Sequence, residues 1–390
     1  MISSAPEVDQ EFQVRLMAEI LVGRSADLPI LSADVVTSLF KLAELHGVAA
    51  LLYARLNSTH FSNASGWAEL VPMLRDAALA GAAWELGHRR VLGPVLKDLA
   101  QTGASPLLFK GTALAYQCYA SPELRMRGDT DILIDRSRRD QAISVLRAHG
   151  FSAQTRLMGE YASYQQSYSR VDSLGMTHEF DLHWELSNSQ VLSGALSHEE
   201  LRRSAVSIPS LHPSALGPSP LHALLIAALH RAQHAQVPYY AHDEAHLEPN
   251  RLIWLFDIHL LSKRFDERDW DGFADMARSK GLCGVASDGL HAAASRFGGD
   301  SHDAALERLR PSARETPMIY FMAGPARRLW MDYFALPGWR ARTQFVKEQV
   351  FPPAEYMTWR YGPTPPLARP LRYVWRALAG VARLFMRRGK

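Results

Sequence analysis

Apolar residues recur every three or four positions in the first part of the chain. This spacing covers residues 35–56 and again residues 67–99, and it places the apolar side chains on one face of a helix. Ser32 stands just ahead of the first run, in the position of an N-cap. The pattern therefore predicts an N-terminal helical region over residues 1–104.

The pattern changes at residue 105, where short apolar runs and turns replace the helical spacing. Residues 106–109 are an apolar run that stops at Lys110-Gly111, which is typical of a buried strand ending in a turn. Residues 177–186 alternate between polar and apolar, which predicts the clearest strand of the chain. The elements expected in between are a helix, a strand and a second helix, at residues 112–119, 129–134 and 140–149. Strands alternating with helices predict an α/β (α+β) fold with its sheet within residues 105–215.

Helical spacing returns after residue 216. Three helices are predicted, at residues 221–234, 251–262 and 270–278, and we assign residues 216–335 to a helical domain. Prolines then mark an irregular stretch, at Pro352, Pro353, Pro363, Pro365, Pro366 and Pro370. Residues 336–390 are thus predicted to be a proline-rich segment followed by a tail.

The composition is that of an ordinary globular protein. The 390 residues are 47% hydrophobic and 21% charged, which excludes a wholly disordered chain and a fibrous repeat. Two cysteines, Cys118 and Cys283, cannot form a disulfide framework or a zinc site built of thiolates. No run of about 18 uncharged apolar residues is present, and the first residues do not have the pattern of a signal peptide. We therefore expect no transmembrane segment and a cytoplasmic location.

Charge is unevenly distributed along the chain. The formal net charge is +3, but the last 22 residues, 369–390, contain seven Lys or Arg and no acid. Apolar residues there recur every three or four positions beside a stripe of arginines, which predicts a basic amphipathic helix. Such a helix can lie at the periphery of an anionic membrane, bind nucleic acid, or pack against protein. The sequence leaves these three alternatives open.

Two aspartates on the predicted strand at residues 129–134 are the strongest sign of chemistry. Asp129 and Asp131 are two positions apart, so a strand points both carboxylates to the same side. Two like charges this close favour a bound cation, and carboxylate oxygens suit Mg²⁺ or Mn²⁺. A pair of such ions about 4 Å apart can hold both the attacking and the leaving oxygen of a phosphoryl transfer. Asp181, on the polar face of the strand at residues 177–186, is the candidate for a third carboxylate.

A phosphate-binding turn can be assigned upstream of the aspartates. Lys110-Gly111-Thr112 joins a predicted strand to a helix, where glycine allows a phosphate to approach closely and free N–H groups favour its charge. Arg125 and Arg127 come just before the aspartates, and guanidinium groups donate paired hydrogen bonds to phosphate oxygens. These five residues are the candidates for binding a nucleoside triphosphate (NTP).

Taken in order, these motifs resemble the nucleotidyltransferases of the DNA polymerase beta superfamily, and more closely the bacterial "uncharacterised nucleotidyltransferase" family. The matching stretches are residues 107–114, 125–134 and 181–184, with His230, residues 251–257 and residues 351–353 as later matches. The resemblance implies a small mixed-sheet nucleotidyltransferase core flanked by helical regions. It also implies that Asp129 and Asp131 bind metal ions and that Asp181 activates an acceptor hydroxyl. The implied reaction moves a nucleoside monophosphate from an NTP to the acceptor and releases pyrophosphate.

Several histidines and one further acid are weaker candidates. His230 and His234 are spaced to share a helix face, as zinc ligands do, and His230 is also a candidate for a place near the nucleotide or the acceptor. Residues 242–246 are a near miss to a metalloprotease motif. Asp257 lies in an apolar helix, so it faces water, pairs with an Arg or His, or reaches the active-site cleft. His183 and Trp184 are interpreted as strand packing.

The sequence therefore predicts a metal-dependent nucleotidyltransferase acting on a protein, an RNA or a small molecule. The alternative is a catalytically inactive protein of the same fold that serves as a binding or scaffold subunit in a peptide or polysaccharide pathway. A third hypothesis, a toxin-like enzyme that nucleotidylates tRNA or protein, shares the chemistry and differs only in its acceptor. The acceptor and the preferred NTP are left open.

Overall fold

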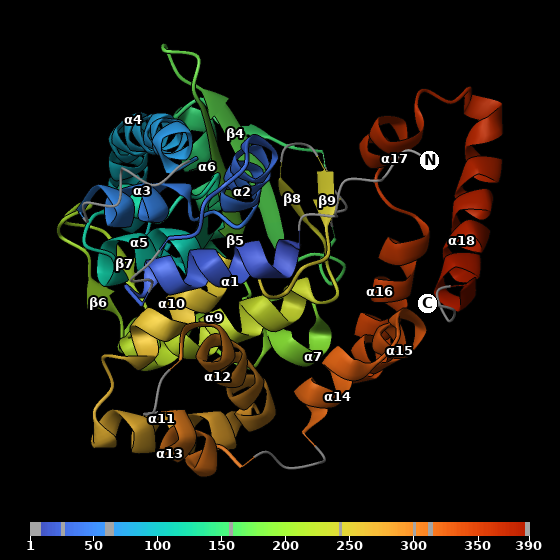
Figure 1. The fold of residues 1–390 in the computed structure, drawn as a ribbon. Coiled ribbons are helices and arrows are strands. Elements are labelled where there is room, and N and C mark those ends of the chain that lie inside the picture. Colours follow the sequence, from blue (N-terminus) through green and yellow to red (C-terminus); the bar gives the residue numbers. More distant parts are fainter. Residues whose placement is uncertain are drawn as a thin grey trace, which may run out of the picture.

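The computed structural model describes residues 9–24, 28–58, 66–155, 159–241, 244–298, 302–310 and 315–386. These residues form a body, in which one five-stranded sheet lies among helices, and a set of C-terminal helices beside it (Figure 1). This arrangement confirms the predicted fold class, a small mixed sheet flanked by helical regions.

The sheet contains the three predicted strands next to one another and two strands that the pattern did not indicate. Its strands are β1 (Leu107–Phe109), β2 (Asp129–Leu133), β3 (Ser152–Ala153), β4 (Gln165–Val171) and β5 (Thr177–His183), in the order β1-β2-β5-β4-β3. β2 and β5 are parallel and all other neighbours are antiparallel. The strand predicted over residues 177–186 ends at His183.

Helices cover both faces of the sheet. On one face, α4 (Trp67–Gln101) and α6 (Arg139–Ala148) pack against Ile132, Phe180 and Leu182. On the other face, α9 (Pro220–His234) packs against Phe109 and Leu133. Short elements complete the core: α5 (Lys110–Cys118), η1 (Pro122–Leu124), η2 (Arg136–Arg138), α7 (Gln190–Ser193), α8 (His198–Arg203), β6 (Val206–Ser207), β7 (Leu216–Gly217), β8 (Tyr239–Ala241) and β9 (Glu244–His246).

The N-terminal region is helical, as predicted, but the run over residues 35–56 is two helices. They are α2 (Ala33–Leu45) and α3 (Ala49–Ser58), and α1 (Gln10–Leu21) precedes them. The break is at Gly47, whose φ of +70° is a conformation that favours glycine. Ser32 occupies the N-cap position of α2 but makes no capping hydrogen bond with its side chain.

The second helical region packs against the first. It contains α10 (Leu252–Ser262), α11 (Glu267–Lys280), α12 (Cys283–Phe297) and α13 (His302–Arg308). Leu252, Trp254 and Phe256 of α10 share one hydrophobic core with α1 to α4. The N-terminal and second helical regions therefore hold each other in place. The boundaries between the four predicted domains stay a prediction.

A C-terminal arm, which we define as α14 to α18, lies beside the body (Figure 1). Its helices are α14 (Thr316–Met322), α15 (Pro325–Ala335), α16 (Gly338–Val350), α17 (Ala354–Tyr361) and α18 (Arg369–Met386), with η3 (Pro366–Ala368) before the last. The prediction of an irregular stretch was wrong over α17, because Pro352 and Pro353 stand ahead of its first residue, where proline is tolerated. Residues 387–390 of the predicted tail lie outside the described residues.

Within the described parts of the chain, no single helix has both the length and the apolar character needed to cross a membrane. α2 and α3 would meet that test only as a pair, bent by 119°. Leu39, Leu51 and Leu52 of that pair are buried in the protein core.

Candidate active site

A cleft of about 1120 Å³ opens where β2 and β5 meet α5 and α9. Eight of the ten residues singled out from the sequence line it: Lys110, Gly111, Arg125, Arg127, Asp129, Asp131, Asp181 and His230. Thr112 and Asp257 are not among its lining residues. The structure thus brings most of these residues together in one cleft, while their roles stay a prediction.

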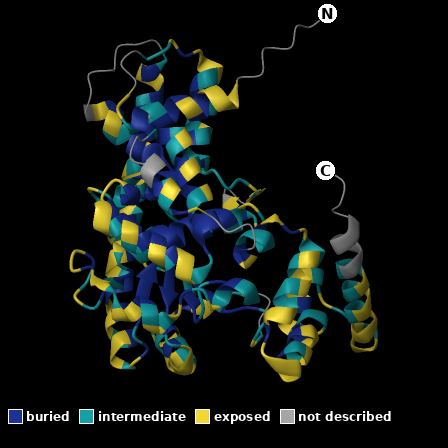
Figure 2. Cartoon of the chain, turned by 90° about the horizontal axis from the view of Figure 1, so that it is seen from below, coloured by how far each residue is buried: buried dark blue, intermediate teal, exposed yellow. Residues whose placement is uncertain are grey.

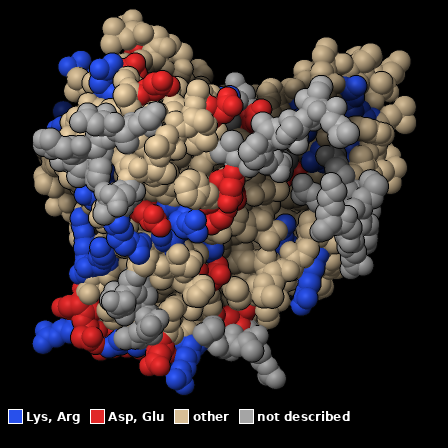
Figure 3. All heavy atoms as spheres, viewed as in Figure 1, with Lys and Arg blue, Asp and Glu red and all other residues tan. Residues whose placement is uncertain are grey.

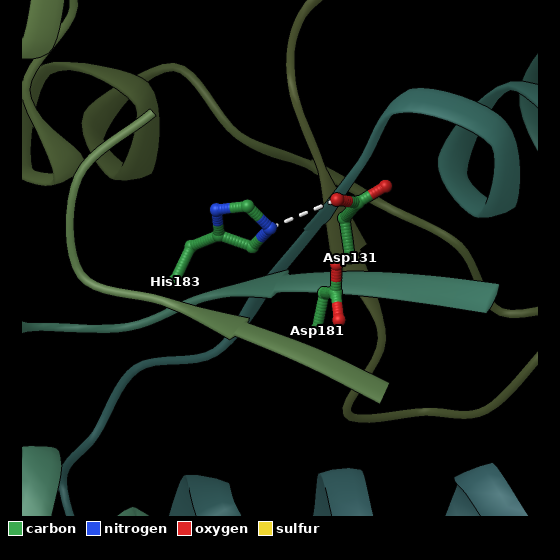
Figure 4. Close-up of side chains that lie close together, drawn as sticks. All are labelled: Asp131, Asp181 and His183. Atoms are coloured by element: carbon green, nitrogen blue, oxygen red, sulfur yellow. Dashed lines mark hydrogen bonds and ion pairs between the residues drawn. The ribbon is translucent and has the colours of Figure 1, made fainter. Parts of the chain in front are cut away.

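The parallel pairing of β2 with β5 brings the predicted carboxylates together. Asp131 is the direct neighbour of Asp181, and Asp129 is the neighbour of Glu179, so all four side chains lie on one face of the sheet. Figure 4 shows Asp131 and Asp181 projecting from adjacent strands, with the ring of His183 turned toward Asp131. One ligand atom from each of these three residues lies within 4.8 Å of the others. This spacing suits a single cation held by two carboxylates and an imidazole.

His183 is the site residue that sequence reasoning missed. Its Nε2 is 2.9 Å from Oδ1 of Asp131, and its side chain is only 1% exposed. Its other ring nitrogen, Nδ1, is buried and has no partner among the described residues. The signal was its position two residues after Asp181, because alternation places both on the same face of the strand.

Lys110 is held beside the carboxylates by an unusual backbone. Its φ is +52°, a left-handed conformation that costs a residue with a side chain about 1–2 kcal/mol. The turn predicted at Lys110-Gly111 is therefore made by the lysine itself. In this conformation its Nζ donates to Oδ1 of Asp131 over 2.6 Å. Backbone strain of this kind persists where the surrounding structure fixes it, and it is common at functional sites.

The charges in the cleft shift the pKa values of the groups around Asp131. Loss of hydration within the cleft, together with the charges of Asp131 and Asp181, raises the pKa of Asp129 to about 7. Burial acts in the same direction on Asp131, but the Lys110 ammonium and the His183 hydrogen bond outweigh it and lower the pKa of Asp131 below its ordinary value. Burial would lower the pKa of Lys110, yet the carboxylate of Asp131 raises it. Asp131 and Lys110 are therefore a charged pair, whereas the surroundings of Asp129 disfavour its charged form.

Arg127 lies beside the turn at Lys110-Gly111-Thr112 and donates from Nε to the hydroxyl of Thr112 over 2.9 Å. Its Nη1 is 2.7 Å from a carboxylate oxygen of Glu85, and its guanidinium lies 5.5 Å from the ring centre of Trp84. Its Nη2 is buried without a partner among the described residues. Arg127 is among the lining residues of the cleft, but this nitrogen is not exposed there.

Arg125 is committed to a buried ion pair with Asp257. Its Nη2 and Nε donate to the carboxylate over 2.7 and 2.9 Å, and both side chains are about 5% exposed. The hydroxyl of Tyr119 donates to the same carboxylate over 2.6 Å. Among the three alternatives left open for Asp257, the structure therefore shows pairing with an arginine. The pair ties the loop before β2 to α10.

A chain of buried hydrogen bonds supports the turn from behind the sheet. It runs from Arg127 through Thr112, Thr130, His88 and His178 to Asp172, with steps of 2.9, 2.8, 2.7, 3.1 and 3.1 Å. The arginine at one end can only donate and the carboxylate at the other end can only accept. Each group along the chain therefore donates to the next one in the direction of Asp172. Burial lowers the pKa of His88 well below its ordinary value, which keeps this ring neutral as the direction requires. The hydroxyl of Thr112 thus fixes the turn, and it does not face the cleft.

His230 and His234 form part of the opposite wall. Their Nε2 atoms are 3.2 Å apart, and the ring of His234 stacks on Trp254 at 4.5 Å. Burial lowers the pKa of His234 to about 4, so the pair is neutral at physiological pH. Neither histidine belongs to a cluster with three metal-binding side chains in the described parts of the chain. His242 and Asp243 of the near-miss motif lie outside the described residues, and Glu244–His246 form strand β9.

Comparison with known proteins agrees with this geometry. No curated protein matches the chain. The model of a family described as "uncharacterised nucleotidyltransferase" matches residues 34–298, a range that contains the whole sheet and every residue assigned above to the candidate site. The match confirms the resemblance found in the sequence. The chain therefore belongs to the uncharacterised nucleotidyltransferase family and is an enzyme that transfers nucleotidyl groups.

Proposed function

We propose that the protein transfers the nucleoside monophosphate part of an NTP to an acceptor hydroxyl, with a divalent metal ion as cofactor. The observation that carries this proposal is the pairing of Asp131 with Asp181 on parallel strands, beside Asp129 and the ammonium of Lys110. The acceptor is a protein, an RNA or a small molecule.

The donor set fits Mg²⁺ or Mn²⁺. Asp129, Asp131 and Asp181 supply carboxylate oxygens, which these ions prefer. Desolvation and the charges of Asp131 and Asp181 raise the pKa of Asp129, and a bound cation would favour its charged form. The hydrogen bonds from Lys110 and His183 to Asp131 both end at Oδ1, and neither of them uses Oδ2. When bound, a divalent ion would polarise phosphate oxygens and neutralise the charge that develops on them.

The protein's own residues would handle the proton and the phosphates. Asp181, which also accepts a hydrogen bond from Gln165 over 3.2 Å, would take the proton of the acceptor hydroxyl. The hydroxyl oxygen then bonds to the α-phosphorus, the bond from that phosphorus to the bridging oxygen breaks, and pyrophosphate leaves with the electron pair. Lys110 and Arg127 line the cleft and would supply cationic donors for phosphate oxygens.

The test is labelling with each of the four NTPs carrying label on the α-phosphate, together with Mg²⁺ and a lysate of the source cells. Asp129→Asn is the informative variant because Asp129 is exposed in the cleft, so the fold should survive. We expect transfer of label to fall at least about a hundredfold, as removal of a metal-binding charge predicts. Asp275→Asn, a change of the same kind on the exposed surface of α11, should leave transfer unchanged. Equal transfer by wild type and Asp129→Asn would refute the proposal.

Ligand binding also tests the alternative that the sequence left open, an inactive scaffold protein of the same fold. Lys110 already neutralises Asp131 at 2.6 Å, so the site can be stable without a cation. Calorimetric titration with MgATP and the other Mg-NTPs separates the alternatives, because a scaffold that has lost the activity would give no binding heat with any of them.

We also propose that the reaction takes place in the cytoplasm, where NTPs are made. Fractionation of source cells with an antibody against the protein tests this location. The proposed location would be contradicted if the protein were recovered neither in the cytoplasm nor on the cytoplasmic side of the membrane.

A further inference from the structure

Helix α18 presents its apolar side to solvent. Leu371, Val374, Trp375 and Leu378 are 72, 55, 57 and 65% exposed. Their spacing of three, one and three residues places them on one helix face, and we call this face the apolar stripe. A helix on the surface of a soluble protein normally turns such a face toward the core, so the orientation of α18 is reversed.

Polar contacts on the opposite face hold the helix in this orientation. Arg372 donates to the carbonyl oxygens of Tyr361 and Gly362 over 2.7 and 3.0 Å. Tyr373 donates to Pro352 over 3.0 Å, and Arg376 donates to Gln349 over 2.5 Å. Since these contacts use the polar face of α18, the apolar stripe is left available.

The rest of the arm has the same character. Its exposed aromatic side chains are Trp330, Phe334, Trp339, Phe351 and Trp359, each at least 59% exposed. Figure 2 shows the arm mostly in the colours of exposed and intermediate residues, in contrast to the buried centre of the body. Residues 316–390 contain thirteen Lys or Arg and three acids. In Figure 3 the visible part of the arm is largely uncharged, with basic side chains between the uncharged ones.

Two of those three acids attach the arm to the body. Glu348 accepts hydrogen bonds from the backbone N–H groups of Glu160, Tyr161 and Ala162 over 2.8 to 2.9 Å. Asp332 accepts one from the hydroxyl of Ser189 over 2.7 Å. The surface that remains on the arm is therefore apolar and basic.

We propose that the arm binds the surface of an anionic membrane, with the apolar stripe inserted among the lipid headgroups. Tryptophan and aliphatic side chains beside arginines are the chemistry that suits this interface, and a cationic arm is attracted to anionic lipid. A nucleic acid fits less well, because the exposed face of α18 is apolar and Arg372 and Arg376 are turned inward. A second copy docked arm to arm fits less well, because both surfaces carry the same charge.

The test is flotation of the purified protein with two kinds of vesicle, phosphatidylcholine alone and equal parts of phosphatidylcholine and phosphatidylglycerol. We expect the wild type to float with the anionic vesicles only, and high salt to weaken this binding. The double variant Leu371→Ser, Trp375→Ser should reduce the bound fraction at least about tenfold, since it removes the largest inserted side chains. Both residues are exposed, and circular dichroism and thermal unfolding of the variant verify that it folds.

The matched control is Leu174→Ser, in the turn between β4 and β5. Leu174 is 76% exposed and Leu371 is 72% exposed, so Leu174→Ser removes about as much apolar surface as the Leu371→Ser change alone, but on the body. This variant should float like the wild type. Absence of wild-type flotation with anionic vesicles, or undiminished flotation of the double variant, would overturn the proposal. So would a wild-type dimer in light scattering that the double variant converts to a monomer.

Discussion

The buried pair of Arg125 and Asp257 makes a prediction whose magnitude the structure defines. Asp257→Asn keeps the shape of the side chain and an acceptor oxygen for Tyr119, but it removes the charge that compensates Arg125. Because both partners are about 5% exposed, the guanidinium would be left without a counterion away from water. Breaking a buried pair in this way costs about 3–5 kcal/mol. We expect the free energy of unfolding to fall by that amount.

An exposed pair of the same chemistry is the control. Asp275 and Arg278 on α11 are 2.6 Å apart, but their side chains are 79 and 59% exposed, in a region where acidic and basic side chains intermingle (Figure 3). Asp275→Asn should therefore cost no more than about 1 kcal/mol. Urea unfolding at neutral pH, followed by circular dichroism, measures both values.

A loss below about 1 kcal/mol for Asp257→Asn, or equal losses for the two variants, would refute the reasoning that burial sets the cost. The double variant Arg125→Met, Asp257→Leu is a further check. It removes both charges and fills the space with apolar atoms, so it should recover most of the stability. Failure to recover would mean that packing at this position, and not the unpaired charge, causes the loss.

Two other predictions concern Lys110, in the turn after β1, and His46, at the end of α2. Lys110→Gly should be about 1 kcal/mol more stable than Lys110→Ala in urea unfolding, because both lose the ion pair but only glycine relieves the positive φ. Equal stability would show that the backbone is not strained. Burial, with help from Arg251 and Arg296, lowers the pKa of His46 to about 4, and its Nδ1 accepts a hydrogen bond from the N–H of Leu252. The unfolded chain binds this proton more readily, so the stability is full above the ordinary pKa of 6.5 and declines as the pH falls towards 4. The wild type should lose about 2 kcal/mol more than His46→Asn between about pH 7.5 and pH 5, and parallel losses in the two proteins would disprove this role.

Local pattern was enough to find the acidic residues of the cleft but not their partners. Alternation along a strand places Asp129 with Asp131, and Asp181 with His183, whatever the rest of the fold. That Asp131 and Asp181 are neighbours depends on the parallel pairing of β2 with β5, which no local pattern encodes. His183 was interpreted as packing for this reason, since its hydrogen bond to Asp131 joins residues far apart in the chain.

Long-range pairing also explains which features of the fold the sequence pattern did not predict. Gln165, Gln166 and Ser167 of β4 have no apolar alternation, and they form a strand because β5 lies alongside. Arg125, whose predicted contact with a triphosphate stays a prediction, pairs in the structure with Asp257 of α10. The composition of a segment shows which groups are available, whereas the tertiary fold decides which of them remain free for a ligand.

The ion pair between Lys110 and Asp131 has a consequence for the order in which the site is loaded. Under the proposed mechanism, Lys110 would act as an internal counterion for Asp131 and would let the enzyme fold before its metal ion binds. If a divalent ion bound Asp131, the ammonium of Lys110 would lose this partner and would favour another anion nearby. The triphosphate of an incoming nucleotide is such an anion, so metal and nucleotide would each favour the arrival of the other. The resting enzyme would in this way respond to the metal–nucleotide complex more than to either component alone.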